Sequence, residues 1–213
     1  AIIMVHGDDQ GLILPPKLAP HQVVIVPIYK TDSEQAQVVE RARKLKSELA
    51  AFNLRVILDE REGTSPGFKF NDWEMRGVPL RVEIGPKDLA KNTVVLARRD
   101  KPGKEGKSFV PQEGLPSAIS RALEEIQKAL YDRALAFRKA NTADPKDYEE
   151  FRSAVEKGFA YSFWCGRPEC EQEIKEETKA TVRNIPLEQT TGSGACIHCG
   201  QPAREKAYFG KAY

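Results

Sequence analysis

Short apolar runs alternate with amphipathic stretches between residues 22 and 110. The apolar runs have the length of β-strands, and they lie at residues 22–28, 54–58, 80–84, 93–97 and 108–110. The stretches between the first four runs carry apolar side chains at helical spacing or a helix start, at residues 31–52, 65–77 and 86–91. This alternation predicts an α/β fold with a mostly parallel sheet and right-handed crossovers.

The second half of the chain is dominated by helical patterns. Residues 115–140 predict a long amphipathic helix, and residues 169–179 predict an acidic one. We expect Asp144 and Pro145 to cap a further helix that continues to about Glu156. The apolar stripe of the long helix comprises Ile119, Ala122, Leu123, Ile126, Leu130, Ala134 and Phe137.

Residues 1–19 predict a strand, a turn, a returning strand and a linker. Residues 1–5 read as an apolar strand, residues 6–11 as the turn, residues 12–14 as the second strand, and residues 15–20 as a proline-rich linker. A strand as apolar as the first one needs neighbours on both sides. We therefore expect the numbering to begin inside a larger protein, or a partner segment to be missing, and we expect no signal peptide.

Composition narrows the class of protein without assigning a function. The 213 residues (23.8 kDa) suffice for one large or two modest domains, and 40% hydrophobic with 30% charged residues exclude wholesale disorder. The 14 prolines and 15 glycines argue against a coiled coil, and no apolar run reaches the roughly 18 residues of a membrane span. A net charge of +2 neither favours nor opposes a nucleic-acid partner, so such a partner must be inferred from local patches.

The cysteines give the sharpest local signal. All four lie in the last quarter of the chain, as a C-x4-C and a C-x2-C pair separated by 25 residues: Cys165, Cys170, Cys196 and Cys199. Four thiolates in two close pairs match a structural, tetrahedral zinc site with no open coordination position. Two disulfides are the alternative in a secreted protein, and a thioredoxin-like redox pair would need a strand-to-helix context that is lacking here. We expect His198, which lies between two ligands, to point away from the metal.

No catalytic constellation stands out, whereas one basic stretch does. Three scattered histidines suggest no triad, and phosphate-binding glycine loops are absent. Residues 76–107 contain nine Lys or Arg against four Asp or Glu, and Phe68, Phe70 and Trp73 precede them. Aromatic and basic side chains together bind unpaired bases and phosphates. The alternative is that Phe68 and Trp73 are core residues and the lysines form a solvated face.

Several segments resemble one family, in that family's order. Residues 6–16 resemble the segment that follows motif 3 in prolyl-tRNA synthetases of the archaeal/eukaryotic type, which are class II enzymes. Residues 19–27 look like the opening strand of the anticodon-binding domain shared by several class II synthetases, and residues 59–67 and 77–86 match its later part. The four cysteines and the terminal Lys211, Ala212 and Tyr213 resemble the zinc-binding C-terminal domain of the same subtype.

The resemblance implies a division into domains. Residues 1–19 would be the end of a class II catalytic domain and a linker. Residues 20–112 would form an α/β anticodon-binding domain with a mixed, mostly parallel five-stranded sheet flanked by helices. Residues 113–213 would form an α+β zinc-binding domain.

The same resemblance implies an activity. The chain would be part of an ATP-dependent ligase that joins L-proline to tRNA(Pro), in a cytoplasmic homodimer without membrane association. Zn²⁺ would be structural, and ATP and Mg²⁺ would act in the complete enzyme. These residues lack motifs 1 and 2 and the motif 3 arginine, so no catalytic residue is assigned and this portion alone should be inactive. His6 would lie next to the active site, and Tyr213 would be ordered, half-buried and packed toward the catalytic domain.

Two other classes of protein stay open at this point. One is a non-catalytic RNA-binding protein that uses the anticodon-binding fold by itself. The other is a zinc-stapled protein-interaction module that binds no RNA.

Anticodon reading can be argued from chemistry. Proline codons begin with CC, so the anticodon carries two adjacent guanines, whose Watson–Crick edge shows two donors that a carboxylate matches. The other edge of guanine offers O6 and N7 to an Arg fork. We expect Glu83 and Arg76 to read the guanines, Arg81 and Lys87 to hold phosphates, and Phe68 or Phe70 to stack a base. The alternative is that Glu83 and Arg81, on one face of their strand, form only a surface ion pair.

Overall fold

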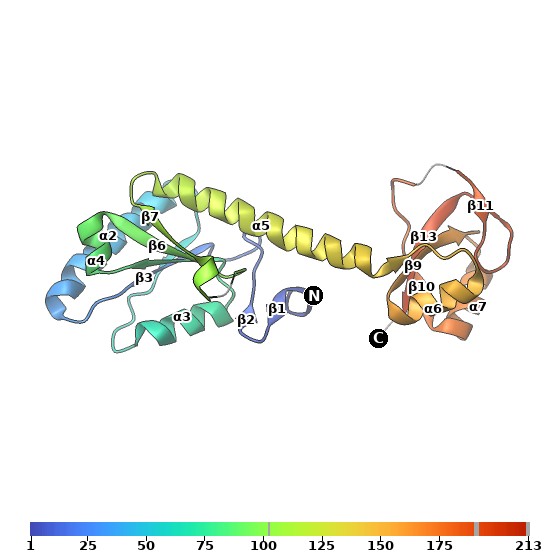
Figure 1. Cartoon of the computed structure of the whole chain (residues 1–213), viewed down its shortest axis with the longest axis horizontal. Coiled ribbons are helices and arrows are strands. Elements are labelled where there is room, and N and C mark those ends of the chain that lie inside the picture. Colours follow the sequence, from blue (N-terminus) through green and yellow to red (C-terminus); the bar gives the residue numbers. More distant parts are fainter. Residues whose placement is uncertain (102, 190–191, 212–213) are drawn as a thin grey trace. The chain divides into compact units, whose positions relative to one another are not determined.

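The computed structural model describes residues 1–101, 103–189 and 192–211 (Figure 1). The chain divides into two compact units between Asp132 and Arg133, and each unit has its own hydrophobic core. Within the described ranges, no helix combines the length and the apolar character that crossing a membrane requires.

The first unit is built on a five-stranded mixed sheet, as expected. The strands follow the order β4-β3-β5-β6-β7, and their bounds are β3 (Val23–Pro27), β4 (Val56–Leu58), β5 (Leu80–Ile84), β6 (Thr93–Arg98) and β7 (Lys107–Pro111). The β3 strand pairs in parallel with β4 and β5, whereas β5–β6 and β6–β7 are antiparallel. The sheet was expected to be mostly parallel, but the helical residues 86–91 connect two antiparallel strands, β5 and β6, so two of the four pairings are parallel. The β7 strand forms one edge of the sheet.

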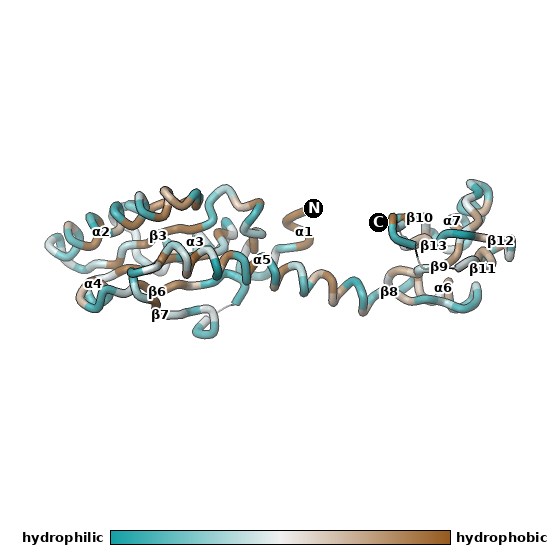
Figure 2. Tube along the Cα trace, turned by 90° about the horizontal axis from the view of Figure 1, so that it is seen from above, coloured by the Kyte–Doolittle hydropathy of each residue, from teal (hydrophilic) through white to brown (hydrophobic). Residues whose placement is uncertain are grey.

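Helices cover the two faces of this sheet unequally. One face packs against α2 (Asp32–Ala50), α4 (Pro86–Lys91) and the first half of α5 (Leu115–Ala140), and together they form the larger core. The other face packs against α3 (Pro66–Met75), whose Trp73 contacts a smaller cluster around β3. In Figure 2, β3 is hydrophobic along its length, while α2 alternates hydrophobic and hydrophilic residues. A strand buried on both faces and an amphipathic helix have these two patterns.

The long helix α5 follows its predicted bounds, and its apolar stripe is buried only in part. Its side chains enter the first core at Leu115, Ile119, Leu123, Ile126 and Leu130. The later members of the expected stripe, Ala134 and Phe137, are exposed. The first compact unit therefore extends to residue 132, beyond the expected boundary at 112–113 between the two domains.

The start of the chain differs from the expected strand. Residues 2–6 form a short helix, α1 (Ile2–His6), and the side chains of Ile3, Met4 and Val5 are exposed. No described strand lies beside this run. A helical turn forms some of its backbone hydrogen bonds within itself, such as that from the Val5 N–H to the Ala1 carbonyl, whereas an unpaired strand forms none, so the strand prediction is wrong here. The predicted turn is confirmed, since β1 (Gly7–Asp8) and β2 (Gly11–Leu12) pair as a hairpin.

Residues 11–14 dock against the end of α3. The backbone of Gly77 has φ +75°, and a Cβ built at Gly77 would lie 2.8 Å from backbone atoms of Leu12. The Leu14 N–H donates to the Gly77 carbonyl at 3.1 Å, and Ile13 enters the main core. Glycine is therefore required at this position both for its conformation and for the close approach.

The second unit is an α+β structure. Its sheet has the order β10-β13-β9-β8, with β8 (Thr142–Ala143), β9 (Phe159–Trp164), β10 (Ala180–Asn184) and β13 (Glu205–Lys211). Two helices, α6 (Tyr148–Lys157) and α7 (Pro168–Thr178), pack on it, and a small hairpin joins β11 (Gly194–Ala195) to β12 (Pro202–Ala203). The cap of α6 is Asp147, not the predicted Asp144, because Asp144 is paired with Lys206 at 2.7 Å.

Candidate functional site

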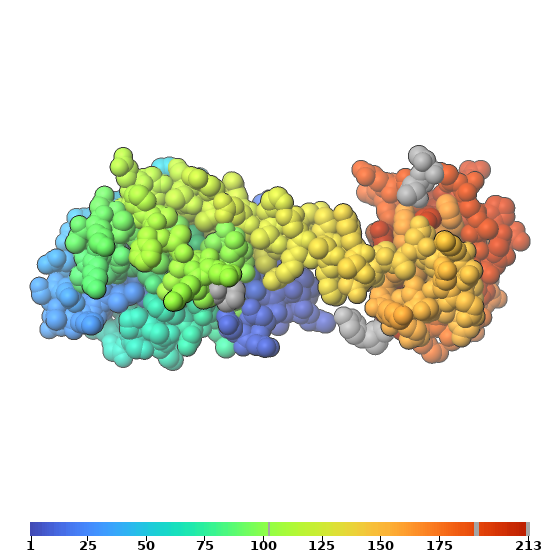
Figure 3. Space-filling model, in the orientation of Figure 1, coloured from blue at the N-terminus to red at the C-terminus, as the bar shows by residue number. Residues whose placement is uncertain are grey.

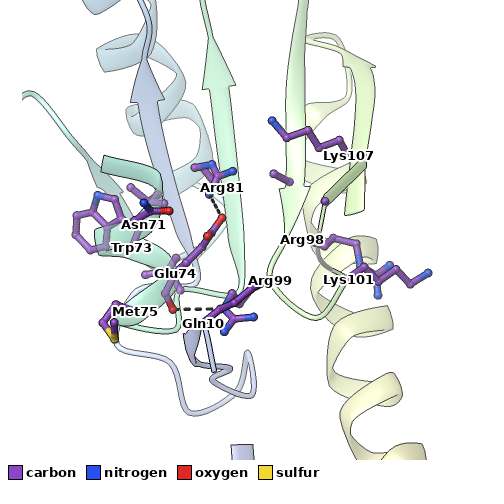
Figure 4. A pocket seen from close by; sticks show the side chains of 14 residues that line it. Gln10, Asn71, Trp73, Glu74, Met75, Arg81, Arg98, Arg99, Lys101 and Lys107 are labelled. Carbon is purple, nitrogen blue, oxygen red and sulfur yellow. Dashed lines mark hydrogen bonds and ion pairs between the residues drawn. The ribbon is translucent and has the colours of Figure 1, made fainter. Parts of the chain in front are cut away.

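A basic cavity of about 530 Å³ opens in the first unit, on the face of the sheet that α3 covers only in part (Figure 4). Side chains from the β1–β2 hairpin, α3, β3, β5, β6 and β7 line it. Five of the lining residues are cations and one is a carboxylate. The cations are Arg81, Arg98, Arg99, Lys101 and Lys107, and the carboxylate is Glu74. Cationic side chains around a surface cavity suit a polyanion, although carboxylates pair with Arg81, Arg98, Arg99 and Lys107.

Arg81 is the centre of an ion-pair network under this cavity. Its guanidinium lies 2.7 Å from Glu74 Oε1 and 3.0 Å from Glu83 Oε1, and its side chain is 9% exposed. Lys107 Nζ lies 3.0 and 3.1 Å from the two Glu83 carboxylate oxygens. The guanidinium also lies 4.0 Å from the centre of the Phe70 ring. Arg81 is thereby fixed in place by two carboxylates and one aromatic ring.

Sheet register brings these groups together. Arg81 pairs with Ala97 on β6, and Ala97 pairs with Lys107 on β7. Residues paired across neighbouring strands point to the same face of the sheet, so the small Ala97 side chain leaves room between the two cations. On β5 the alternate residues Leu80, Val82 and Ile84 enter the main core.

Arg98 and Arg99 at the cavity rim are held by acidic partners. Arg98 is paired with Asp100 at 2.9 Å and with Glu125 at 2.6 Å. Arg99 donates to both carboxylate oxygens of Asp8 in the β1–β2 hairpin, at 3.0 Å for one of them. The hydrogen bonds from Arg99 hold the pKa of the Asp8 carboxyl below its usual value. The hairpin is thus tied to the edge of the cavity.

The structure brings together some of the predicted anticodon residues and separates others. Arg81 and Glu83 pair, as the alternative foresaw, but both are buried rather than on the surface. Phe70 lies under Arg81, whereas Phe68 is exposed on α3. Lys87 lies in the first turn of α4, past the opposite end of β5 from the cavity.

Arg76 and Trp73 lie at the end of α3. The exposed Arg76 donates to Asp72 at 3.1 Å and lies 5.0 Å from the Trp73 ring centre. Trp73 is buried against β3, as the core alternative predicted for it.

The sequence reasoning did not single out Glu74 or the rim cations. Glu74 is one helical turn after Phe70, so helical spacing could have placed it on the same side of α3. Lys107 and Arg98 were counted in the basic stretch, but their position required the β5–β6–β7 register.

A buried carboxylate fixes α3 in position. Asp59 follows β4 and accepts hydrogen bonds from Arg61 at 2.7 Å and from the Trp73 indole N–H at 2.8 Å. The buried Lys69 Nζ lies 3.7 Å from Asp59 Oδ1. Burial alone would raise the pKa of Asp59, but the hydrogen bonds from Arg61 and Trp73 outweigh it and lower that pKa to about 2.

In the second unit, the four cysteines form one cluster. The sulfur atoms of Cys165, Cys170, Cys196 and Cys199 all lie within 4.8 Å of one another, and none is in a disulfide. Cys170 Sγ and Cys196 Sγ are 3.6 Å apart, and Cys165 Sγ and Cys199 Sγ are 3.8 Å apart. Tetrahedral coordination with metal–sulfur bonds of about 2.3 Å requires sulfur separations of about 3.8 Å. The cluster can therefore hold one metal ion, and the two-disulfide alternative does not describe it.

The surroundings favour the thiolate at Cys199, whereas burial raises the pKa of the Cys170 thiol. The backbone N–H of Gln201 lowers the pKa of the Cys199 thiol to about 6, and the Arg167 guanidinium, which donates to Cys199 Sγ at 3.2 Å, acts in the same direction. His198 Nδ1 lies 3.5 Å from Cys170 Sγ, and its ring also lies near Glu173 and Glu177. His198 is thus a neighbour of the cluster outside the set of four sulfurs.

The two residues expected near an active site lie at the ends of the chain. His6 ends α1, and its carbonyl accepts a hydrogen bond from the Ile13 N–H at 2.8 Å. Tyr213 lies outside the described residues, so its predicted order and burial stay predictions.

Comparison with known proteins agrees with this arrangement. A model of the anticodon binding domain matches residues 22–121, and a model of the prolyl-tRNA synthetase C-terminal domain matches residues 148–213. The chain is 54% identical over 213 residues to a proline–tRNA ligase of Roseiflexus castenholzii and 49% identical over 216 residues to that of Cytophaga hutchinsonii. It is 48% identical over 216 residues to the chloroplastic/mitochondrial proline–tRNA ligase of Arabidopsis thaliana.

The matches cover all of this chain but only part of each relative. Each alignment covers 100% of the chain but 44%, 43% and 40% of the three relatives, respectively. The chain therefore spans less than half of their length.

The two domain matches place the chain among the aminoacyl-tRNA synthetases. More specifically, the chain comprises the anticodon-binding and C-terminal domains of a proline–tRNA ligase. Similarity to such ligases along the whole of this chain favours this identification over a stand-alone RNA-binding protein or a protein-interaction module.

Proposed function

We propose that the first unit recognises the anticodon of tRNA(Pro) for an ATP-dependent proline–tRNA ligase. The observation that carries the proposal is the basic cavity, in which Glu74 is the one carboxylate among five cations. Cations neutralise RNA phosphates, and a carboxylate matches the two donors on the Watson–Crick edge of guanine. The names and identities of the relatives support the same assignment.

Within this cavity, Glu74 and Glu83 are both candidates for reading guanine. Glu74 lines the cavity and its side chain is 32% exposed, so it can meet a base without leaving Arg81. Glu83 is 8% exposed and already paired with Arg81 and Lys107, so reading by Glu83 requires one of these pairs to open. Glu74 is therefore the preferred residue for direct contact with a guanine. Glu83, the residue predicted from the sequence, is the second candidate.

Three exposed residues are proposed to make the remaining contacts with the RNA: Arg76, Lys87 and Phe68. Arg76 is exposed at the end of α3 and offers its fork to the O6/N7 edge of a guanine. Lys87 is exposed and is proposed to contact a phosphate away from the cavity. Phe68, exposed on α3, is the better placed of the two predicted stacking residues, because Phe70 is covered by Arg81.

For the second unit, we propose that the four cysteines bind one structural Zn²⁺. The separations between their sulfur atoms and the closed set of four thiolates support Zn²⁺, which takes this geometry in structural sites. Zn²⁺ supplies only coordination there, while Cys170 and Cys196 anchor the cluster in the core.

The complete protein is proposed to bind L-proline, ATP and Mg²⁺ outside these residues. The complete protein is also proposed to be a cytoplasmic homodimer of the archaeal/eukaryotic subtype. The portion described here is expected to have no ligase activity by itself.

Aminoacylation by the complete protein tests the anticodon assignment. The substrates are tRNA transcripts in which each anticodon guanine is changed to adenine. We expect Glu74→Gln to cost about 1–3 kcal/mol with the cognate tRNA and to relax discrimination at one position, because an acceptor becomes a donor facing guanine's donors. Glu40→Gln, an exposed change on α2, is the matched control.

The outcomes separate the two carboxylates. Loss of discrimination in Glu83→Gln but not in Glu74→Gln would reverse the assignment. Discrimination that is unchanged in both variants would contradict guanine reading in this cavity.

A further inference from the structure

The edge strand β7 carries a phenylalanine that the rest of the described chain does not cover. Phe109 is 76% exposed, although it lies in the middle of β7 (Lys107–Pro111). Figure 3 shows the yellow-green segment around β7 at the surface of the first unit. Large apolar side chains on exposed edge strands promote unwanted association, so natural edges usually carry charged or small residues.

Register places this ring beside the basic cavity. Phe109 pairs with Val95 on β6, and Val95 pairs with Glu83 on β5. The neighbouring row on the same face is Arg81, Ala97 and Lys107, which lines the cavity. Two residues along a strand span about 7 Å, so Phe109 follows directly after the cavity's last cation.

The surroundings of Phe109 indicate what would cover it. The nearest charged side chain on its face of β7 is Lys107, and the segment before β7 adds Lys101 and Lys104. An exposed aromatic ring next to cations matches how proteins hold single-stranded nucleic acid, with stacking for the base and charge for the phosphate. An apolar protein partner would instead have to cover the charged side chains of Lys101 and Lys104.

We propose that Phe109 is a stacking platform for the unpaired nucleobase that adjoins the bases held in the cavity. This inference rests on the proposed function, because it takes RNA to be the ligand of the cavity. The Phe109 ring then stacks on the base of a nucleotide that flanks the guanines in the anticodon loop. Every base has a flat face, so this stacking does not depend on base identity. Base identity is read in the cavity, and Phe109 fixes the path of the RNA across the β-sheet toward β7.

A double-mutant cycle with the 213-residue chain tests the proposal. The probe is an anticodon stem-loop RNA with two adjacent loop guanines, together with versions in which each flanking loop base is replaced by an abasic nucleotide. We expect Phe109→Ala to weaken binding about 5- to 150-fold, and Phe109→Trp to retain it. One abasic position should weaken binding to a similar extent in the wild type and have little further effect in Phe109→Ala.

The controls separate this inference from the function it rests on. Phe52→Ala removes a similarly exposed ring (62%) next to α2, which packs on the other face of the sheet, and should leave the affinity unchanged. Replacing both guanines by adenines should weaken binding to wild type and to Phe109→Ala alike.

Unchanged affinity in Phe109→Ala, or losses that simply add at every abasic position, would overturn the stacking role while leaving the function intact. Failure of the wild type to prefer the guanine RNA would overturn both.

Discussion

At the scale of single residues, the buried Asp59 joins the end of β4 to α3. It is 3% exposed, and it binds Arg61 and Trp73 and lies next to the buried Lys69. Because Lys69 and Trp73 belong to α3, this carboxylate fixes the helix that carries Glu74 and Phe70 into the cavity. Its charge therefore supports both stability and the geometry of the site.

Removing that charge should destabilise the first unit. We expect Asp59→Asn to lower the free energy of unfolding by about 2–4 kcal/mol at pH 7, since it leaves Lys69 buried without a full counter-charge. Urea unfolding, followed by the tryptophan fluorescence to which Trp73 contributes, measures the change. Asp132→Asn removes an exposed carboxylate paired with Lys128 and should change stability by less than about 0.5 kcal/mol.

The same carboxylate predicts a pH dependence. The pKa of Asp59 is lowered from 3.8 to about 2 in the folded protein, so the ionised form stabilises the fold. This stabilisation, about 1–2 kcal/mol after solvent screening, is fully present above about pH 4 and is lost as the pH falls toward 2. The difference between wild type and Asp59→Asn should shrink over that range. A difference that stays constant from pH 7 to pH 2 would contradict the assigned charge.

At the scale of elements, local signals in the sequence predicted most helices and strands. Ser65 and Pro66 begin α3, and the apolar run at residues 80–84 matches β5 residue for residue. The prediction failed where burial decides the structure, as at α1, whose apolar residues have no partner strand among those described. It also misplaced the cap of α6, because the partner of Asp144 comes from β13, distant in the sequence.

The candidate sites show the same limit. Cysteine spacing sufficed to predict the four-sulfur cluster, because close pairs of ligands define such a site locally. The cavity could be predicted only as a basic stretch of sequence. The register of three strands decides which basic side chains lie near Arg81, and the sequence does not give that register. Burial of Glu83 could not be foreseen for the same reason.

The capping box of α2 gives a prediction for an element. Thr31 Oγ1 accepts from the Glu34 N–H at 3.3 Å, and Glu34 Oε2 accepts from the Thr31 N–H at 3.4 Å. Thr31→Ala should lower the free energy of unfolding by about 1 kcal/mol, because donors in the first turn lose their partner. Ser33→Ala, at an exposed position in the same turn, should have a smaller effect in the same urea titration.

At the scale of the whole molecule, the two units depend on different sources of stability. The first has a large apolar core of side chains from the sheet, α2 and α5. The second has a smaller core that includes Cys170 and Cys196, so the proposed metal binding there would add directly to its folding free energy.

Removal of the metal should therefore affect one unit only. We expect a chelator to raise amide hydrogen exchange from about residue 160 onward, in β9, α7 and β13, and to leave β3 and β5 protected. Cys199→Ser should give the same pattern without chelator. Full protection of α7 after treatment, in protein that elemental analysis finds free of zinc, would contradict a structural metal.

The ion pairs that join β5 to β7 also constrain how the sequence can change over time. Arg81 and Glu83 are buried and Lys107 pairs with Glu83, so losing any one of the three leaves a buried charge with too few partners. Single substitutions at these positions are costly even where a double or triple replacement would restore the balance. The three positions should consequently be inherited as a set, while Leu80, Val82 and Ile84 exchange freely among apolar residues of similar volume.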